Sequence, residues 1–530
     1  MWFKAMTVVL CLILLALCGC SAKDEQAERQ SLHVAALSNP LTLNPLFVRE
    51  AASAEVSYLL HSPLLFTDPE TLDVRPGIVS AWEIGNDGRT YTLTMREDVF
   101  WSDGEPVTAE DVAFTLRVIC HPDYTGWMFL FASSIEGASA YRDGHRSPFA
   151  DGEIAGLRVL GDYALEIRLA ETFAPFLSHL ALAPLPFHLL GSVPVTELEG
   201  HAYSREAHVV NGPFRLANWR PEEYLHFQAN LYYFLGQPKI RDIFYRIIPS
   251  QETQMMEFLA GRLDLLPTVV RVEDVALLQA DPDVAVYQNR RLAYDYLGFN
   301  LRNGHTALSD RRVRQALSLV LDRQKIVENL LLGHGQVASG PLLPLHFAYE
   351  PGQLELQPDR VKAGKLLREA DVLPLNLKLI YNAGNAVREN VALFFKDQAA
   401  TVGVTVQVVV LEWEAFLSAL RDGAYDLVIL GRGADPDPDL SYHWHSRGPG
   451  NRLGYVNRQV DALLEAGNAT LDRRERTRLY REAQRLILED VPMIWLYSRP
   501  AIHAATSRLK NFLPHPETPF YHVHLWELGD

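Results

Sequence analysis

Cysteine is scarce in this sequence. The 530 residues contain four cysteines, and three of them, Cys11, Cys18 and Cys20, fall within the first 20 residues. Cys120 is therefore the one cysteine in the rest of the chain. Because a disulfide needs a pair, an internal disulfide framework is excluded for the folded part.

Basic residues are outnumbered. Lys and Arg total 49 against 65 Asp and Glu, which gives a formal net charge of −16. A nucleic-acid partner needs a basic surface for its phosphates, so we expect none. Hydrophobic residues make up 48% and charged residues 22%, as in ordinary soluble proteins, and the length predicts two or three domains.

The sequence also lacks the motifs of common enzyme classes. It has no G-x-S-x-G, no H-E-x-x-H, no P-loop and no spaced Cys/His cluster. The paired carboxylates Glu222–Glu223, and Glu412 with Glu414, are interpreted as solvated surface. We expect no catalytic residue, no cofactor and no metal centre. A secreted hydrolase is the alternative from another class, and turnover of a peptide or glycoside would favour it.

The long apolar run lies at the N-terminus. Lys4 precedes Met6–Leu17, which is almost entirely apolar and too short to span a bilayer with margin. Leu17-Cys18-Gly19-Cys20 then resembles a bacterial lipobox. We expect residues 1–19 to be a signal peptide, Cys20 to carry a lipid anchor, and 20–31 to be a periplasmic tether. An uncleaved anchor is the alternative, and Ser21 after the cysteine is compatible with the outer membrane.

The first half of the chain mixes strands and helices. A strand is predicted from Leu32, and Thr90–Arg96 alternates as a half-buried strand. Thr108 and Asp111 form a capping box that begins a helix. Leu157–Leu169 predicts two strands around a turn. Gln251–Leu259 predicts a helix that faces inward through Met255 and Leu259.

The second half contains a regular β-α-β-α-β pattern. The expected strands are Leu375–Tyr381, Val404–Leu411 and Tyr425–Leu430, and the helices between them are Ala386–Thr401 and Trp413–Arg421. Short connections through helices predict parallel strands with right-handed crossovers. The carboxyl ends of such strands share one sheet edge, where open α/β sheets usually bind ligands.

Polar residues follow each of these strands. Tyr381–Asn382, Glu412–Trp413 and Arg432–Asp435 are therefore expected to converge. Gly431 and Gly433 are interpreted as the break that ends the third strand. This edge predicts a protein that captures a solute.

Four long segments resemble the bacterial extracellular solute-binding proteins of the peptide and nickel family, the receptors of ABC importers: Arg75–Arg117, Asn211–Thr253, Tyr296–Val327 and Asn451–Gly467. The resemblance implies an α/β fold of the class II periplasmic-binding-protein type, in its large peptide-binding form. This fold has two lobes around a hinged central cleft, and an extra inserted domain.

The resemblance also implies a division of the chain. We expect lobe I to comprise residues 32–62, 195–290 and 498–530, the inserted domain 63–194, and lobe II, with the β-α-β-α-β unit, 291–497. Function would be capture of a small peptide or peptide-like ligand by hinge closure, followed by delivery to ABC permease membrane subunits. We expect a monomer. A chemoreceptor or sensor kinase in place of the permease is an alternative.

The resemblance assigns the ligand site to the stretch Gly431–Asp435. Asp435 matches the G-x-x-D aspartate that pairs with a ligand α-ammonium group, with Gly433 and Ala434 beside it. Arg432 stands where family members carry Trp, and would pair with Asp435 or contact an anionic ligand group. Asp437 and Asp439 are interpreted as loop solvation.

Three further residues complete the predicted site. Asn382 lies where dipeptide-binding members use an arginine for the ligand carboxylate, and Arg388 is the nearest arginine here. A strict dipeptide specificity is therefore not expected. Trp413 and Tyr442 are predicted to line apolar ligand pockets.

Nickel or haem capture by the same fold is the main alternative. His443 and His445 form an H-x-H pair whose side chains would share one face of a strand, and His201 and His208 lie elsewhere. With 18 histidines in the chain, a chance pair is common. Peptide binding is therefore preferred.

Overall fold

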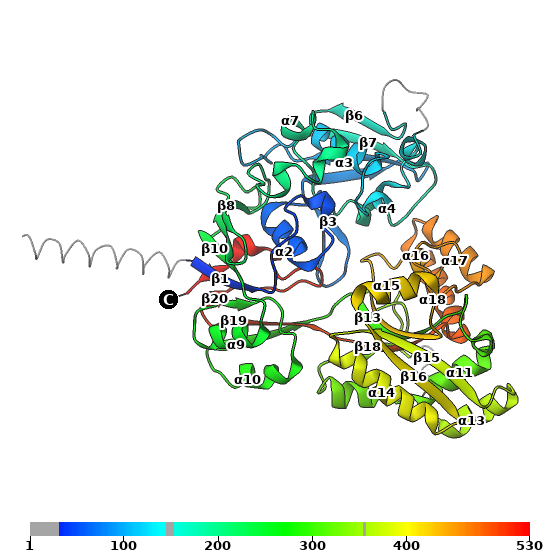
Figure 1. The fold of residues 1–530 in the computed structure, drawn as a ribbon. Helices are drawn as coiled ribbons and strands as arrows, with labels where there is room; N and C mark the ends of the chain where they lie inside the picture. The colour runs from blue at the N-terminus through cyan, green and yellow to red at the C-terminus, as the bar shows by residue number, and fades with distance from the viewer. Residues whose placement is uncertain (1–30, 145–152, 353–356, 530) are drawn as a thin grey trace, which may run out of the picture.

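A computed structural model describes residues 31–144, 153–352 and 357–529. The predicted signal peptide and the lipidation site Cys20 lie outside the described residues, as does the tether up to Gln30. Ser31, expected in the tether, begins strand β1 (Ser31–Ala36). The ribbon in Figure 1 has two parts. One part lies at the top and left, and the other, at the lower right, is coloured mainly orange, yellow and green.

The first lobe is built on a seven-stranded sheet of order β12-β19-β11-β1-β10-β9-β8. β1 pairs parallel with β10, whereas β9 and β12 make antiparallel pairs. Segments from the start, middle and end of the chain thus share this sheet. The other strands are β8 (Phe214–Arg220), β9 (Tyr224–Ala229), β10 (Asp242–Ile247), β11 (Leu265–Leu266), β12 (Val284–Asn289) and β19 (Ala501–Thr506).

Two helices flank this sheet near the cleft. α2 spans Ala51–Leu60, and α9 spans Gln251–Leu259 as predicted. The predicted inward face of α9 is confirmed at Met255, which packs against the core, and wrong at Leu259, which is 40% exposed. Gln254 and Phe258 are buried, because the helix packs on β11 one position away from the expected stripe.

A four-stranded antiparallel sheet, β4-β5-β7-β6, forms the region inserted into the first lobe. Its strands are β4 (Val79–Ile84), β5 (Thr90–Met95), β6 (Leu157–Gly161) and β7 (Ala164–Arg168). Helix α3 (Ala109–Cys120) begins with the predicted capping box, in which the Thr108 backbone N–H donates to Asp111 at 2.7 Å. Cys120, at the end of α3, is buried and free.

The second lobe is built on a six-stranded sheet of order β14-β18-β13-β17-β15-β16. β15 pairs parallel with both β16 and β17, so the predicted β-α-β-α-β unit is confirmed. The strands are β13 (Ala293–Phe299), β14 (Gln336–Val337), β15 (Leu375–Asn382), β16 (Val404–Leu411), β17 (Leu427–Gly433) and β18 (Met493–Ser498), and helices α14 (Ala386–Ala400) and α15 (Trp413–Asp422) connect the unit.

The predicted end of β17 is wrong. The strand continues through both glycines, because Gly431 pairs with Asp295 and Gly433 with Ala293 on antiparallel β13. Gly431 is needed for space rather than for a turn, since a Cβ there would lie 2.8 Å from Nη2 of Arg388.

Two short segments connect the lobes. One, around Arg290–Leu292, leads from β12 to β13, and the other, Arg499–Pro500, leads from β18 to β19. The second lobe has its own hydrophobic clusters on the two faces of its sheet, separate from the core of the first lobe. Two separate cores joined by two crossing segments form a hinge. Among the described residues, no helix is long and apolar enough to span a membrane.

Candidate ligand-binding cleft

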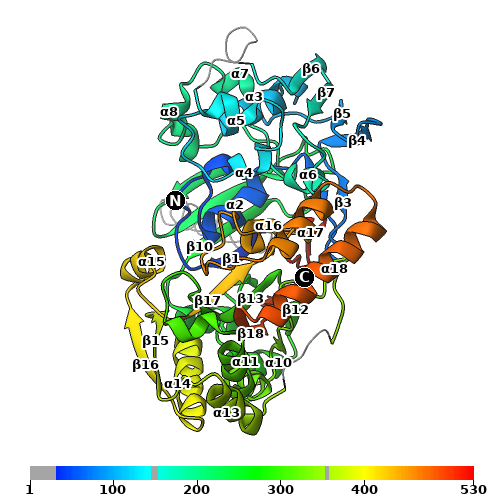
Figure 2. The same cartoon turned by 90° about the vertical axis from the view of Figure 1, so that its right-hand side faces the viewer.

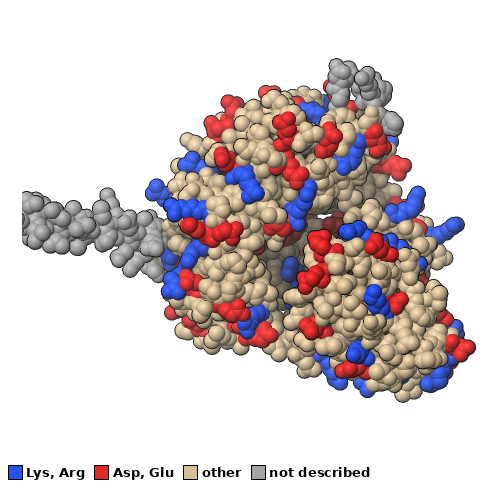
Figure 3. Space-filling view, viewed as in Figure 1, with Lys and Arg blue, Asp and Glu red and all other residues tan. Residues whose placement is uncertain are grey.

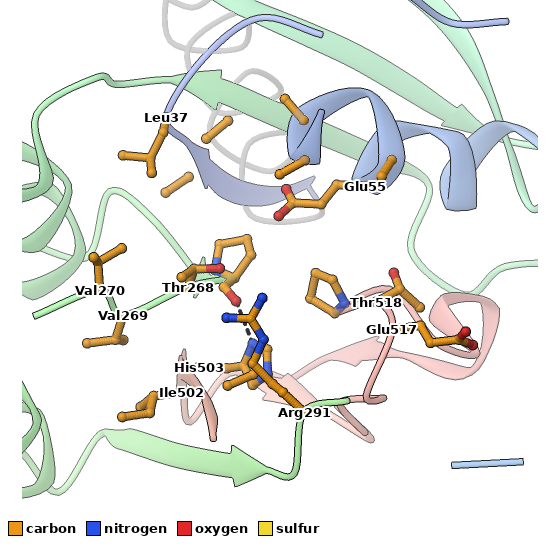
Figure 4. Close-up of a pocket in the computed structure, with 18 of the residues that line it drawn as sticks. Leu37, Glu55, Thr268, Val269, Val270, Arg291, Ile502, His503, Glu517 and Thr518 are labelled. Atoms are coloured by element: carbon orange, nitrogen blue, oxygen red, sulfur yellow. Dashed lines mark hydrogen bonds between the residues drawn. The ribbon is translucent and has the colours of Figure 1, made fainter. Parts of the chain in front are cut away.

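A cavity of about 560 Å³ opens at the hinge between the lobes. Its walls come from the end of β1, helix α2, the segments after β11 and β18, and the C-terminal stretch around Glu517 (Figure 4). The space-filling surface is hollowed between the two parts of the molecule in the same region (Figure 3). A volume of this size is typical of small-molecule sites.

Carboxyl groups line the first-lobe side of this cavity. Glu55 on α2 accepts a hydrogen bond of 2.5 Å from the Tyr245 hydroxyl, and burial raises the pKa of Glu55 to about 7. Burial also raises the pKa of Glu517 to about 7, and the nearby charge of Asp435 adds to this shift. Because Asp435 belongs to the second lobe, a charge of one lobe acts on a carboxyl group of the other.

Asp435 follows β17 directly, at the predicted sheet edge. Its side chain is solvent-accessible, although the walls of the cleft surround it. Burial, followed by the charges of Asp439 and Asp437, raises its pKa to about 6. His346 Nε2 lies 2.9 Å from its backbone carbonyl, whereas its carboxylate accepts no hydrogen bond from the described residues. A carboxylate without a partner in a cleft is suited to bind a cation.

The interpretation of Asp437 and Asp439 as loop solvation is wrong. Asp437 pairs with Arg476 at 2.6 Å, and the two side chains are only 12% and 8% exposed. Asp439 accepts hydrogen bonds from the Ser441 backbone N–H at 2.8 Å and from Asn468 Nδ2 at 3.0 Å. Both aspartates therefore hold the loop that carries Asp435.

Arg432 does not pair with Asp435 in the described structure. Its guanidinium lies over the rings of Tyr296, at 5.1 Å, and Trp444, at 5.3 Å. Alternate residues of a strand point to opposite faces, and Arg432 points into the aromatic cluster under the sheet. This side chain lines neither of the two cavities, and its contact with a ligand stays a prediction. Its neighbours Gly433 and Ala434 lie near the hinge, where the Ala434 N–H donates to the Leu292 carbonyl at 2.7 Å.

Asn382 contacts the nearby arginine. Its Oδ1 accepts a hydrogen bond of 2.6 Å from Arg388, which also pairs with Asp295 at 3.2 Å. The Arg388 and Asp295 side chains are 14% and 15% exposed, so this arginine already has partners in the second lobe. The structure does not bring Asn382 to the cavity.

The two predicted aromatic residues lie in different places. Trp413 is 51% exposed at the start of α15, where it stacks on Phe416, and lines none of the cavities described here. Tyr442 lines a second cavity of about 270 Å³, together with Asp435 and with Phe173 and His179 of the inserted region.

This second cavity lies where the inserted region meets the second lobe. The Ala174 N–H donates to the Asn468 carbonyl at 2.7 Å, and Arg473 pairs with Asp73 at 2.6 Å. Helix α17 (Arg458–Asn468) and helix α18 (Arg473–Asp490) carry the second-lobe partners (Figure 2). Asp435 therefore lines a cavity whose walls come from both the inserted region and the second lobe.

The predicted histidine pair is not on a strand. His443 lies in the short helix α16 (Ser441–Trp444) and His445 follows it, so the two side chains do not share one strand face. His443 Nδ1 lies 3.2 Å from the Gly450 carbonyl, and His445 Nε2 lies 3.0 Å from Glu465. Among the described residues, no cluster of three or more His, Cys, Asp or Glu side chains is arranged to hold a metal ion.

The sequence analysis missed the residues that give the main cavity its charge. These are Glu55, Glu517, Arg291 and Arg499. The two arginines follow strands β12 and β18, neither of which was predicted from the sequence. Glu55 and Glu517 had no signal in the sequence, because only the tertiary fold brings α2 and the C-terminal stretch together.

The fold and the cleft define a class of protein: two-lobed α/β binding proteins that enclose a solute at a hinge. The chain belongs to the bacterial extracellular solute-binding proteins, family 5, whose middle-region model matches residues 73–453. This confirms the family resemblance and the fold class. It also places the chain among solute-binding proteins rather than enzymes.

Individual relatives cover nearly the whole chain. The oligopeptide-binding protein AppA of Bacillus subtilis is 27% identical over 553 aligned residues, 98% of this chain and 97% of AppA. A solved structure of AppA with a nonapeptide has a TM-score of 0.77 at 26% identity, covering 94% of this chain and 99% of that one. NikZ of Campylobacter jejuni, solved with Ni(L-His), shares the fold with a TM-score of 0.78 at 22% identity, covering 94% and 99%.

Proposed function

We propose that this protein captures an oligopeptide or a peptide-like cation in the interlobe cleft and delivers it to an ABC permease. The observation that carries the proposal is the Asp435 carboxylate, which lines the second cavity and accepts no hydrogen bond from the described residues. Its charge also acts on Glu517 of the other lobe. Two carboxylates repel each other when the cleft closes. A ligand ammonium group between them replaces that repulsion with two charge-assisted bonds, so a bound cation favours closure.

The relatives support a peptide as the carrier of this ammonium group. AppA is named an oligopeptide-binding protein, and its structure was solved with a nonapeptide. In this proposal Asp435 binds the α-ammonium group, with Gly433 and Ala434 setting its position, and Tyr442 contacts a ligand side chain in the second cavity. The large total cavity volume is compatible with a ligand longer than a dipeptide.

We also propose where the protein acts. Residues 1–19 would be removed, Cys20 would be lipidated, and the monomeric protein would remain on the periplasmic side of a membrane, at the outer membrane if Ser21 directs sorting. The division into lobe I, inserted domain and lobe II at residues 62, 194, 290 and 497 is part of the same proposal. The family description as extracellular proteins supports this location.

The test has two stages. Mass spectrometry of peptides that co-purify from the native host identifies a ligand, and calorimetry then compares wild type with Asp435→Asn. We expect the variant to lose about 1.5–3 kcal/mol of binding free energy, because a charge-assisted hydrogen bond is lost. Asp162→Asn, on the exposed turn between β6 and β7, is the matched control and should bind normally. An unchanged dissociation constant for Asp435→Asn removes Asp435 from the site.

A stability measurement separates binding from a structural role. The pKa of Asp435 is raised from its ordinary value of 3.8 to about 6 in the folded protein, so its contribution to stability is greatest in acid and is lost as pH rises through about 6. Above that pH, Asp435→Asn should not lower the free energy of unfolding of the ligand-free protein. A large loss there would indicate that Asp435 holds the loop instead.

Nickel-chelate or other small-solute capture is the second candidate. The NikZ structure with Ni(L-His) favours it, because that protein has the same fold. In this protein, however, the two candidate histidines contact other groups within the second lobe. A peptide is therefore the ligand that the cleft supports best.

A further inference from the structure

Two arginines lie on the segments that connect the lobes. Arg291 follows β12 and Arg499 follows β18, and both side chains line the 560 Å³ cavity. Arg291 points toward the middle of this cavity (Figure 4). Each of the two chain crossings thus contributes a guanidinium group to the cavity.

These arginines have no carboxylate partner among the described residues. Asp295, the nearest carboxylate in sequence to Arg291, is already paired with Arg388. Arg499 lies 6.0 Å from the ring of Tyr497, a contact that leaves its N–H groups available. Burial lowers the pKa of Arg291, the charge of Arg499 lowers it further, and the charge of Asp295 raises it. Asp295 is shared with its partner Arg388, so one carboxylate faces three cations and a ligand carboxylate would balance the remaining positive charge.

The opposite side of the cavity carries the opposite charge. Glu55 faces Arg291 from α2 across the space (Figure 4), yet no ion pair joins them. Glu517 lies in the C-terminal stretch at one edge of the cavity (Figure 4). The cleft is therefore acidic toward α2 and the C-terminal stretch, and basic at the hinge. A cleft with opposite charges on its two sides is complementary to a dipolar solute.

We propose that Arg291 and Arg499 form a subsite for a carboxylate of the bound solute. This inference rests on the proposed function, because it adds the anionic end to a ligand whose cationic end contacts Asp435 and Glu517. Planar guanidinium groups bind carboxylates through paired N–H donors, and two such groups can hold one carboxylate from both sides. The ligand class is then a peptide, or a similar amino-acid derivative, with a free carboxylate.

The location of the subsite links binding to the hinge. An anion between Arg291 and Arg499 removes the repulsion between the two crossing segments and fixes their relative position. A rotation of one lobe relative to the other must bend these two segments, because they connect the sheets of the described lobes. Carboxylate binding therefore stabilises one hinge arrangement over others.

A modified peptide mixture tests the subsite. The purified full chain is incubated with a tryptic digest of serum albumin in three forms: unmodified, with its amines acetylated, or with its carboxyl groups converted to methyl esters. Peptides that remain bound after gel filtration are quantified by mass spectrometry. For wild type, we expect esterification to reduce retention by about tenfold or more, since charge-assisted bonds are lost.

The variants assign this effect to the arginines. In Arg291→Gln combined with Arg499→Gln, unmodified and esterified peptides should be retained equally, whereas acetylation should still reduce retention. Asp435→Asn should show the reverse pattern. Arg158→Gln, an exposed position on β6 away from the cavity, is the charge-matched control and should behave as wild type. Arg291→Lys combined with Arg499→Lys keeps the charge if the glutamine variant does not fold, and should discriminate less than wild type.

The outcomes separate the two proposals. If esterification does not change the retention of peptides by wild type, the carboxylate subsite is wrong, whereas the proposal of peptide capture is unaffected. The same follows if the glutamine variant discriminates as well as wild type, or if Arg158→Gln alone abolishes discrimination. If wild type retains no unmodified peptide, both the peptide proposal and this subsite are wrong.

Discussion

The buried pair between Arg476 and Asp437 makes the stability of the second lobe depend on one arginine. Arg476 on α18 donates to Asp437 at 2.6 Å and to the Tyr480 hydroxyl at 3.0 Å. It also lies over the ring of Phe347 at 5.4 Å. With exposures of 8% and 12%, neither charged side chain has water as a substitute partner. Arg476→Ala would leave the Asp437 carboxylate buried without a partner.

The expected loss follows from that isolation. Removing one partner of a buried ion pair typically costs about 3–5 kcal/mol, because the remaining charge stays desolvated. Burial already raises the pKa of Asp437, and Arg476 is the group that opposes this shift. Without the arginine, Asp437 should take up a proton on folding, which limits the loss and makes it smaller in acid. We expect a loss of about 3–5 kcal/mol above neutral pH.

Urea unfolding monitored by tryptophan fluorescence measures this loss, since Trp444 and Trp495 are buried in the second lobe. The two lobes can unfold separately, so the transition must be fitted for the second lobe alone. Arg474→Ala, an exposed change on the same helix, should stay within about 0.5 kcal/mol of wild type. Adding Asp437→Asn to Arg476→Ala should recover part of the loss. A loss no larger than that of Arg474→Ala would refute the reasoning.

Two further predictions concern ligands. The affinity for a peptide with a free α-ammonium group should fall as pH is lowered from about 8 to about 5. The pKa values of Asp435 and Glu517 are raised to about 6 and about 7, so both groups become neutral in this range and no longer attract a cation. Fluorescence titrations that show constant or rising affinity over this range would contradict the prediction. Calorimetry with Ni²⁺ alone should show no tight stoichiometric binding, because His443 contacts the Gly450 carbonyl and His445 contacts Glu465. Tight binding that is lost in His443→Ala would reverse our choice of ligand.

Local patterns were sufficient to predict the β-α-β-α-β unit and the position of Asp435. Apolar runs of strand length, amphipathic helices between them and short connections leave few arrangements, and a residue that directly follows a parallel strand lies at the ligand edge. The capping box at Thr108 was equally local. These features depend on neighbours in sequence, so the sequence alone determines them.

The role of Arg432 could not be read in the same way. Its environment is made by Tyr296 on β13 and Trp444 on α16, which approach it only when the antiparallel strand β13 pairs with β17. Gly431 was interpreted as a break because glycine is uncommon inside strands, whereas its lack of a Cβ makes room for Arg388. In each case the deciding partner comes from a distant segment.

The single buried thiol of the described chain has a practical consequence for observing the protein at work. Cys120 is inaccessible, and burial raises its pKa to about 12, so it stays an unreactive thiol near neutral pH. Maleimide dyes or spin labels would therefore attach selectively to cysteines introduced elsewhere, for example in place of Asp73 in the inserted region and Arg473 on α18. The distance between two such labels would report the opening and closing of the cleft in real time, without first removing any native cysteine from the folded part.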